Sequence, residues 1–260
     1  MHDFFKAFIL GIVESVTEFL PVSSTGHLIL VNQWISFDEP FTTLFDIVIQ
    51  LGAILAVAVC FRKELFSFSK NETFTLWKKV IISVFPSLVI GALCYHTIEK
   101  KLFNPWVVAM ALVAGGIVLL LLEKNAEEKP VQTLEGLNFK TALLIGFIQC
   151  IAMIPGTSRS AATIIGAMLL GCSRVVAAEF SFFLAIPTMV AASGYSLLKL
   201  GLNLSFHDFI VLNIGFWTSF FMAWVVIECF LNYVRKKDFR PFAWYRIVLG
   251  SVILFFFFLK

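Results

Sequence analysis

Six separate stretches of this chain are each long and apolar enough to cross a lipid bilayer as a helix. The hydrocarbon core of a bilayer requires about 20 apolar residues of helix. Because backbone N–H and C=O groups find no water inside that core, such segments must satisfy each other as helices. The stretches lie at about 42–61, 79–98, 104–122, 174–199, 208–234 and 241–259.

The composition excludes a soluble fold. Hydrophobic residues make up 59% of the 260 residues and charged residues only 14%, with a mean hydropathy of +0.91. Soluble domains carry about 25% charged residues, so this chain lacks the polar side chains that a soluble surface needs. We therefore predict a single all-α integral membrane domain over residues 1–260. Its partner is the lipid bilayer, and no nucleic-acid partner is expected.

The cysteines and the N-terminal run fit this interpretation. The N-terminal apolar run contains Glu14 and Glu18, whereas a cleavable signal peptide has an uninterrupted apolar core. We therefore do not expect a signal peptide here. The cysteines are odd in number and match no metal-site spacing, so we interpret them as small hydrophobic residues. They are Cys60, Cys94, Cys150, Cys172 and Cys229.

Two further apolar stretches, about 4–37 and 139–172, are broken in the middle. Pro21 interrupts the first and Pro155-Gly156 the second, and hydroxyl residues follow each break. Each half is too short to span the bilayer comfortably. Short segments broken by proline or glycine in both halves of a membrane protein are typical of helices that meet near the midplane. We therefore predict two re-entrant helix-turn-helix hairpins in addition to the six transmembrane helices.

The two halves of the chain also align with each other. The matched segments are 11–14 with 146–149, 21–25 with 155–159, and 45–46 with 180–181, at offsets of 135, 134 and 135 positions. A one-residue shift that is reversed further along is what an old internal duplication leaves. Apolar segments match easily by chance, so the alignment alone leaves the duplication open. The repeats would cover about 4–98 and 139–234, with additional spans at 104–122 and 241–259.

Positive charge indicates the orientation of the repeats, because cytoplasmic loops carry an excess of Lys and Arg. Threading the six spans places three basic connections on one side, provided that each hairpin returns to the side from which it enters. The first hairpin then enters from outside and the second from the cytoplasm, so the repeats are inverted. The basic residues of these connections are Arg62, Lys63, Lys70, Lys78, Lys79, Lys124, Lys129, Lys140, Arg235, Lys236, Lys237 and Arg240. The other side holds only a few, such as Lys100, Lys101 and Lys260.

Glu14 and Glu18 are four residues apart, so they share one face of a helix. A charged residue at the bilayer centre costs about 2.5–3.5 kcal/mol on insertion scales. Two carboxylates on one face also repel each other unless a cation lies between them. Both could instead lie in water at an interface. We favour a watery cavity that holds a proton or a divalent cation, because Mg²⁺ and Ca²⁺ prefer carboxylate oxygens and Mg²⁺ is usually shared with substrate phosphates.

Hydroxyl residues in the first hairpin stand where a helix is expected to begin. Ser23, Ser24 and Thr25 follow Pro21, and a helix N-terminus capped by a hydroxyl also attracts anions. His27 comes one helical turn after Ser24, so imidazole and hydroxyl are expected on the same side. A capped half-helix with one buried histidine is the simpler alternative, but two nearby glutamates favour a functional site.

The second hairpin turns at PGTSRS, residues 155–160, and adds an arginine to the hydroxyls. The planar guanidinium of Arg159 can bind phosphate oxygens bidentately. An arginine here could instead extend to the lipid headgroups, but its place among hydroxyls at a helix start favours anion capture. The predicted substrate-binding residues of this hairpin are Gly156, Thr157, Ser158, Arg159, Ser160 and Thr163. If the hairpins meet, they supply the groups for phosphoryl hydrolysis, with a lipid as substrate.

Three segments of the chain resemble the undecaprenyl-diphosphate phosphatase family, whose members are also called bacitracin-resistance proteins. They are GIVESVTEFLPVSSTGHL at 11–28, FDIVIQLGAILAV at 45–57 and IPGTSRSAATIIGAMLLG at 154–171. The resemblance covers nearly the whole chain, without a departure at the motif positions. It assigns the family motifs to Glu14 and Glu18, to Ser23–His27, to Asp46 and Gln50, and to Pro155–Ser160.

The resemblance implies a hydrolase that acts on a diphosphate anhydride, converting undecaprenyl diphosphate to undecaprenyl phosphate and inorganic phosphate. Its product is the lipid carrier of peptidoglycan synthesis, so the activity serves cell-wall biogenesis and cell shape. Consuming the lipid that bacitracin binds gives resistance to that antibiotic. The resemblance also implies stimulation by a divalent cation and a multi-pass protein of the bacterial cytoplasmic (inner) membrane. The active site would open to the outer (periplasmic) face.

Several roles follow as hypotheses. Arg159 and the two half-helix N-termini, including Ser23 and Thr25, would hold the diphosphate, and Glu14 and Glu18 would hold Mg²⁺ or Ca²⁺. Ser24 is the predicted nucleophile, with His27 or Glu18 taking its proton, and a directly activated water is the open alternative.

Other functions remain open at this stage. A secondary transporter or a lipid-phosphate flippase would have the same architecture, and a structural membrane protein without chemistry would leave the buried charges unexplained. The preferred cation, the prenyl chain length and the oligomeric state, with a homodimer among the choices, also stay open.

Overall fold

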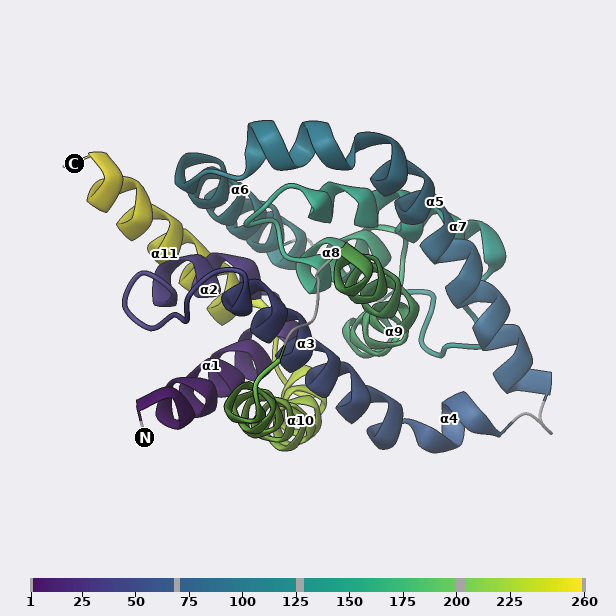
Figure 1. Cartoon of the computed structure of the whole chain (residues 1–260). Helices are drawn as coiled ribbons and strands as arrows, with labels where there is room; N and C mark the ends of the chain where they lie inside the picture. Colours follow the sequence, from purple (N-terminus) through teal and green to yellow (C-terminus); the bar gives the residue numbers. More distant parts are fainter. Residues whose placement is uncertain (1, 68–70, 125–128, 200–203, 259–260) are drawn as a thin grey trace.

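The computed structural model describes residues 2–67, 71–124, 129–199 and 204–258, and these ranges are predominantly helical (Figure 1). Six of the described helices are long and apolar enough to cross a membrane, as predicted. They are α3 (Phe41–Cys60), α5 (Asn71–Leu102), α6 (Pro105–Lys124), α9 (Arg174–Lys199), α10 (Phe206–Val234) and α11 (Arg240–Phe258).

Helix α5 begins at Asn71, well before the predicted start at 79. Its first turns carry polar residues, which a search for apolar length passes over, but they are held by tertiary contacts. Trp77 donates its indole N–H to the carbonyl of Leu65 at 2.8 Å, and Thr73 and Leu76 are buried. Leu65 belongs to the short helix α4 (Arg62–Phe66), which connects α3 to α5.

The two broken stretches each form a helix, a turn and a second helix. In the first, α1 (His2–Phe19) and α2 (Ser24–Val31) flank a turn at 20–23. In the second, α7 (Phe139–Gln149) and the 3₁₀ helix η1 (Cys150–Met153) precede a turn at 154–158 and then α8 (Arg159–Leu169). Ser23 and Ser158 end the turns with φ angles of 75° and 70°, a left-handed conformation that is uncommon outside glycine. The helices are therefore interrupted at the predicted positions.

Helix packing connects the two halves of the chain. Helix α1 packs against α10, and α7 packs against α5, so each broken helix lies against a long helix of the other half. Helix α3 packs against both α9 and α10, and α6 packs against α11 (Figure 1). The polar turns are thereby brought between long apolar helices that belong to both halves.

Glycines permit the closest of these approaches. A Cβ on Gly11 of α1 would lie 2.9 Å from the carbonyl oxygen of Gly215 on α10. Gly146 of α7 faces the Ser83 carbonyl of α5 in the same way, and a Cβ there would overlap that backbone. Small residues that let helix backbones approach are typical of membrane helix packing. A glycine on each broken helix therefore permits its close packing against a long helix.

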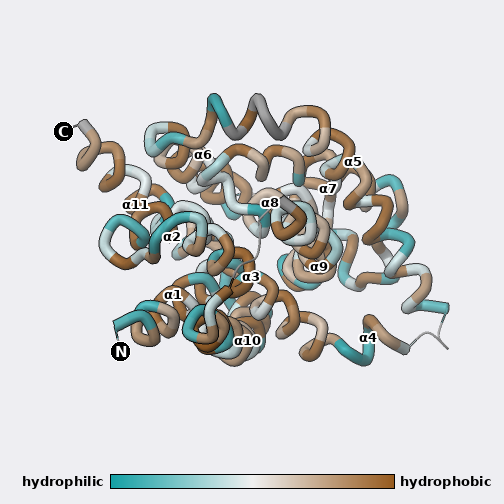
Figure 2. Tube along the Cα trace, viewed as in Figure 1, coloured by the Kyte–Doolittle hydropathy of each residue, from teal (hydrophilic) through white to brown (hydrophobic). Residues whose placement is uncertain are grey.

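Phenylalanine rings fill the core beside these crossings. Phe182 on α9 packs against Phe19, Phe61 and Phe230, with ring centroids between 5.4 and 6.2 Å apart. Outside the core, large apolar side chains of the long helices such as Phe85 are exposed. Figure 2 shows hydrophobic residues along the long helices and hydrophilic residues mainly near helix ends and connections. This distribution fits a protein surrounded by lipid.

The five cysteines are free, as predicted. Cys172, in the connection between α8 and α9, is buried, and this burial raises the pKa of its thiol to about 11. The thiol therefore stays protonated at neutral pH and behaves as a small apolar group.

Candidate active site

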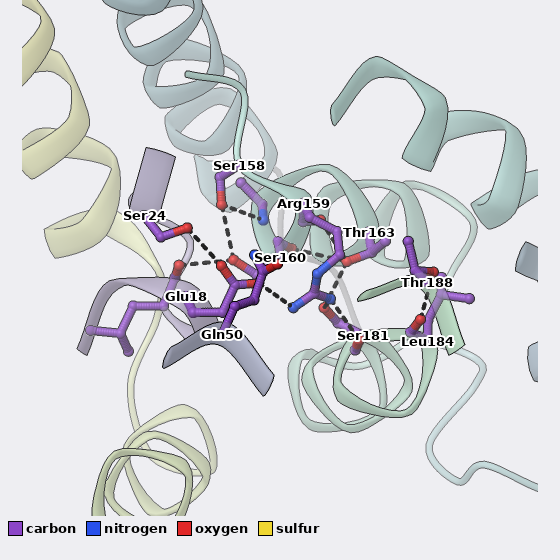
Figure 3. A network of polar contacts seen from close by, with 12 residues as sticks. Glu18, Ser24, Gln50, Ser158, Arg159, Ser160, Thr163, Ser181, Leu184 and Thr188 are labelled. Carbon is purple, nitrogen blue, oxygen red and sulfur yellow. Dashed lines mark hydrogen bonds and ion pairs between the residues drawn. The ribbon is translucent and has the colours of Figure 1, made fainter. Parts of the chain in front are cut away.

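The turns of the two hairpins meet in the structure (Figure 3). Ser160, at the start of α8, donates its hydroxyl to the carbonyl of Leu20 in the first turn at 2.8 Å. Arg159 reaches across to Glu18 on α1, with 3.2 Å between Nη2 and Oε1. The sequence left the meeting of the two hairpins conditional, and the structure shows it in the contacts of Arg159 with Glu18 and of Ser160 with Leu20.

Glu18 is the acceptor at the centre of this contact. Besides the guanidinium of Arg159, it accepts the hydroxyl hydrogen of Ser24, with 2.6 Å between Ser24 Oγ and Glu18 Oε2. Only 7% of the Glu18 side chain and 11% of the Arg159 side chain are exposed. A hydroxyl, a carboxylate and a guanidinium therefore lie in direct contact and largely away from solvent, which is where such interactions are strongest.

Arg159 is oriented from its other side by α9. Its Nη1 donates to the carbonyl of Ser181 at 2.9 Å, and the Ser181 hydroxyl lies 2.7 Å from that of Thr163. The Nε of Arg159 is buried without a hydrogen-bond partner among the described residues. Ser181 was not predicted as a site residue. Its only sequence signal is its alignment with Asp46 in the other half.

The starts of α2 and α8 have matching caps. The Ser23 hydroxyl accepts from the backbone N–H of Gly26 at 3.3 Å, and the Ser158 hydroxyl accepts from that of Ala161 at 3.2 Å. Thr25 is exposed at the start of α2. Each helix start therefore directs backbone N–H groups and the positive end of its dipole toward the meeting point, as an anion site requires.

His27 does not contact Ser24 in this arrangement. Its Nδ1 lies 2.7 Å from the Ser23 carbonyl oxygen, and its Nε2 lies 2.6 Å from the hydroxyl of Tyr245 on α11, whose ring stacks on the imidazole. Because a carbonyl only accepts, the Nδ1 atom carries the hydrogen. Of the two proton acceptors predicted for Ser24, Glu18 is the one in contact. Tyr245 had no signal in the sequence.

Glu14 lies deeper in the same region. Its side chain is 1% exposed, and neither carboxylate oxygen has a hydrogen-bond partner among the described residues. Glu18, Asp46 and Arg159 all lie within electrostatic range of it. A buried carboxylate with two free oxygens suits a hard cation, and Mg²⁺ usually completes its shell with water and phosphate oxygens. No group of three or more His, Cys, Asp or Glu in the described ranges forms a complete metal site.

Two polar residues of α3, Asp46 and Gln50, make hydrogen bonds in the interior. Asn32 donates to Asp46 at 3.3 Å, and Ser193 on α9 donates to Gln50 at 3.4 Å. The second carboxylate oxygen of Asp46 is buried without a partner in the described part of the chain. Asp46 and Gln50, which the family pattern singled out, therefore lie on one side of the interior with two polar residues that were not predicted.

A buried arginine that was not predicted from the sequence as a site residue contacts the main chain of both turns. Arg246 on α11 is 0% exposed. Its guanidinium donates to carbonyls of three segments, at 2.9–3.3 Å: Pro21, Ala111, Leu112, Gly156 and Thr157. The only sequence signal for it is a charged residue inside a predicted span.

Comparisons with known proteins agree over nearly the whole chain. A family model described as "Bacitracin resistance protein BacA" matches residues 7–252. The chain is 50% identical to "Undecaprenyl-diphosphatase 1" of Clostridioides difficile (strain 630), over 99% of this chain and 97% of that protein. It is 47% identical to an "Undecaprenyl-diphosphatase" of Limosilactobacillus fermentum, over 99% and 98% of the two chains. Identity to the "Undecaprenyl-diphosphatase" of Enterococcus faecalis is 44%, over 97% and 96%.

Proposed function

The chain belongs to the bacitracin resistance protein BacA family, and on that premise we propose that it hydrolyses undecaprenyl diphosphate to undecaprenyl phosphate and inorganic phosphate. The observation that carries the proposal is the contact of Ser24, Glu18 and Arg159 where the two turns meet. The proposed nucleophile and its base are six residues apart, and the proposed phosphate ligand reaches Glu18 from 141 positions away. The reaction returns the lipid carrier to peptidoglycan synthesis and protects the cell from bacitracin.

The diphosphate binds between the two helix starts. Arg159 has a buried Nε without a partner in the described ranges and one terminal nitrogen that donates to Glu18, so a phosphate can compete for the guanidinium. The starts of α2, at Ser23–Thr25, and of α8, at Gly156–Ser160, contribute backbone N–H groups. Thr163 contributes indirectly. Its hydroxyl contacts that of Ser181, and the Ser181 carbonyl accepts a hydrogen bond from Arg159 and helps to hold it in place.

Ser24 is the nucleophile and Glu18 its base. When phosphate draws Arg159 away, Glu18 becomes a stronger acceptor and takes the Ser24 hydroxyl proton over the existing 2.6 Å contact. The Ser24 oxygen bonds to the terminal phosphorus as the bond from that phosphorus to the bridging oxygen breaks, releasing undecaprenyl phosphate. Glu18 passes the proton that it took from Ser24 to the bridging oxygen of the departing undecaprenyl phosphate. Water then attacks the phosphoserine and gives a proton to Glu18, and Glu18 returns that proton to the Ser24 oxygen as the Ser24–phosphate bond breaks and inorganic phosphate is released.

A divalent cation, Mg²⁺ or Ca²⁺, neutralises phosphate charge when it is bound. Glu14 is the residue best able to hold it, because both of its buried oxygens are free of hydrogen bonds among the described residues. Glu18, the second expected ligand, has donors on both oxygens and is available only when Arg159 or Ser24 moves.

The membrane arrangement that we propose is a pair of inverted repeats with re-entrant hairpins, in the bacterial cytoplasmic membrane. Three long helices follow each hairpin, and an odd number of crossings reverses the second half relative to the first. Helix starts that are 135 positions apart support a duplication: Ser24 with Arg159, Asn71 with Phe206, and Pro105 with Arg240. The last pair extends each repeat to include α6 and α11. The site then opens to the periplasmic face.

The polyprenyl chain lies in an apolar groove beside the second turn. This groove of about 410 Å³ runs between α6 and the α7–α8 hairpin, and Ala114, Ile151 and Thr157 are among its lining residues. Thr157 is two residues before Arg159, so the groove begins next to the proposed diphosphate position. A lipid held there presents its head to Arg159.

The deciding experiment measures phosphate release by the purified protein from a polyprenyl diphosphate, with and without chelator. Glu18→Ala and Arg159→Ala are compared with the wild type, and each is expected to lose nearly all release. Unchanged release in both variants would contradict the site. No release by the wild type would favour the second function, carriage of a lipid phosphate, which broken helices in inverted repeats also support.

A further inference from the structure

We infer that Arg246 is a positioning residue that fixes the two hairpin turns relative to each other and so sets the geometry of the reaction. The inference rests on the proposed function, because it assigns Arg246 to the same site. Arg246 lies on α11, outside both hairpins, and its side chain is fully buried.

The hydrogen bonds of Arg246 join the turns directly. Nη1 donates to Pro21 O of the first turn at 3.1 Å, and Nη2 donates to Gly156 O and Thr157 O of the second at 3.2 and 2.9 Å. The planar guanidinium holds these donors in a fixed fork. One rigid group therefore sets the distance between the main chains of the two turns.

The partners of Arg246 are carbonyls rather than a carboxylate in the described part of the chain. Nε and Nη2 also donate to Leu112 O and Ala111 O of α6, at 3.3 and 3.2 Å. A buried cation without a paired anion is expensive in a membrane protein, and a neutral residue would fill this space at lower cost. We therefore assign the five hydrogen bonds from Arg246 to backbone carbonyls a role beyond packing.

The positions that Arg246 holds are close to the reacting groups. Pro21 is three residues before Ser24, and Thr157 is two residues before Arg159. A shift of either turn is transmitted to the contacts that Ser24 and Arg159 make with Glu18. Misplacement of reacting groups by about 1 Å costs on the order of 100-fold in rate.

Helix α6 is shaped to admit the guanidinium. A Cβ on Gly115 would overlap Nη2 of Arg246, so any larger residue there displaces it. Position 111 of α6, which aligns with position 246 of α11 at the 135-residue offset, is an alanine whose carbonyl accepts from Arg246. One arginine thus contacts both turns, and the matching position of the other half supplies a carbonyl acceptor for it.

The test uses the purified full-length protein and four variants: Arg246→Lys, Gly115→Ala, the double variant, and Gly194→Ala as a matched control. A Cβ on Gly194 meets nothing within 4 Å. Lysine keeps the charge but cannot span both turns, whereas Gly115→Ala keeps the arginine and displaces it. Turnover and KM are measured with polyprenyl diphosphate, together with the melting temperature and hydrogen exchange of residues 20–24 and 155–160.

We expect Arg246→Lys to lower kcat about 100-fold, with a much smaller change in KM and a melting temperature within a few degrees of the wild type. Both turns should exchange faster. Gly115→Ala should show the same loss of kcat and the same faster exchange, with a larger change in KM because Gly115 also lines the proposed lipid groove. The double variant should have a kcat no lower than that of the less active single variant, because both changes act on one group. If Arg246→Lys does not fold, Gly115→Ala alone carries the test.

An unchanged kcat in the folded Arg246→Lys or Gly115→Ala protein would overturn the inference. Faster exchange in only one turn, or additive losses in the double variant, would do the same. Hydrogen exchange does not depend on turnover, so it still tests Arg246 if the wild type releases no phosphate. In that case the proposed function fails, whereas positioning of the turns stands or falls on the exchange result.

Discussion

Ser24 donates its hydroxyl hydrogen to Glu18 across the turn of the first hairpin, with 2.6 Å between the two oxygens. The residues are only six positions apart, yet they belong to different helices, α2 and α1. Their contact depends on the reversal of the chain at 20–23. A hydroxyl and its proton acceptor are thus already aligned before any substrate binds.

Replacing the hydroxyl tests this alignment. We expect Ser24→Ala to reduce phosphate release by about 1,000-fold or more, because the nucleophile is lost. A phosphorylated Ser24 peptide should be detected by mass spectrometry after rapid acid quench of the wild type with substrate. Thr43→Ala, which removes an exposed hydroxyl on α3, should retain full activity. A fully active Ser24→Ala protein would instead indicate direct attack by water.

The carboxylate of Glu18 is the expected base. Glu18→Gln preserves shape and hydrogen bonding but cannot take a proton, so kcat should fall about 100- to 10,000-fold. Glu18→Asp, which shortens the side chain but keeps the base, should lose less. The control is Glu72→Gln, at the start of α5. Comparable kcat values for Glu18→Gln and the wild type would remove Glu18 as the base and leave it only a binding role.

Arg159 should be irreplaceable by lysine. A lysine ammonium keeps the charge but cannot contact Glu18, Ser181 and a phosphate with one fixed fork. We expect Arg159→Lys to lower kcat/KM about 100-fold or more, as the loss of a preorganised donor does at other phosphate and oxyanion sites. Arg62→Lys, in the short helix α4, is the matched control. Steady-state kinetics on both variants would detect the difference, and equal values would contradict it.

The divalent-cation concentration that the enzyme requires should be set by Glu14. The wild type is expected to lose activity in chelator and to regain it with Mg²⁺ or Ca²⁺. Glu14→Gln should raise the cation concentration for half-maximal activity by at least about tenfold, because a ligand oxygen is lost. Titration of each metal after chelation measures this, with Glu64→Gln as the control. An unshifted titration curve for Glu14→Gln would exclude Glu14 as the ligand.

The groove beside α6 should discriminate prenyl chain length. Ala114→Trp fills the groove and is expected to lower kcat/KM for undecaprenyl diphosphate about tenfold. A short-chain substrate such as farnesyl diphosphate should be affected much less, because little of it reaches Ala114. Val225→Trp places the same ring at an exposed position on α10, away from the groove, and serves as the control. Equal losses for both substrates would show that the groove does not hold the chain.

Most of the fold could be predicted because its signals are local. Each span depends on its own hydropathy, and each turn is marked by a proline followed by hydroxyls. Glu18, Ser24 and Arg159 could be predicted as site residues, because ionisable groups inside apolar segments are costly. Their meeting could be stated only as a condition, because nothing in the sequence fixes how the two hairpins pack. Tyr245, Ser181 and Arg246 could not be predicted as site residues from the sequence. Arg246 meets Pro21 from 225 positions away, and its partners are backbone carbonyls, which carry no mark in the sequence. The early start of α5 was missed because tertiary contacts, rather than hydropathy, hold its first turns.

The packing of α1 against α10 has a consequence for biosynthesis. A chain that enters the membrane from its N-terminus delivers Glu14 and Glu18 first, but the helix that seats them ends at Val234 (Figure 1). Until α10 has been synthesised and inserted, the first hairpin has no permanent position in the bilayer. The first hairpin therefore reaches its final packing only after α10 has been inserted, late in translation.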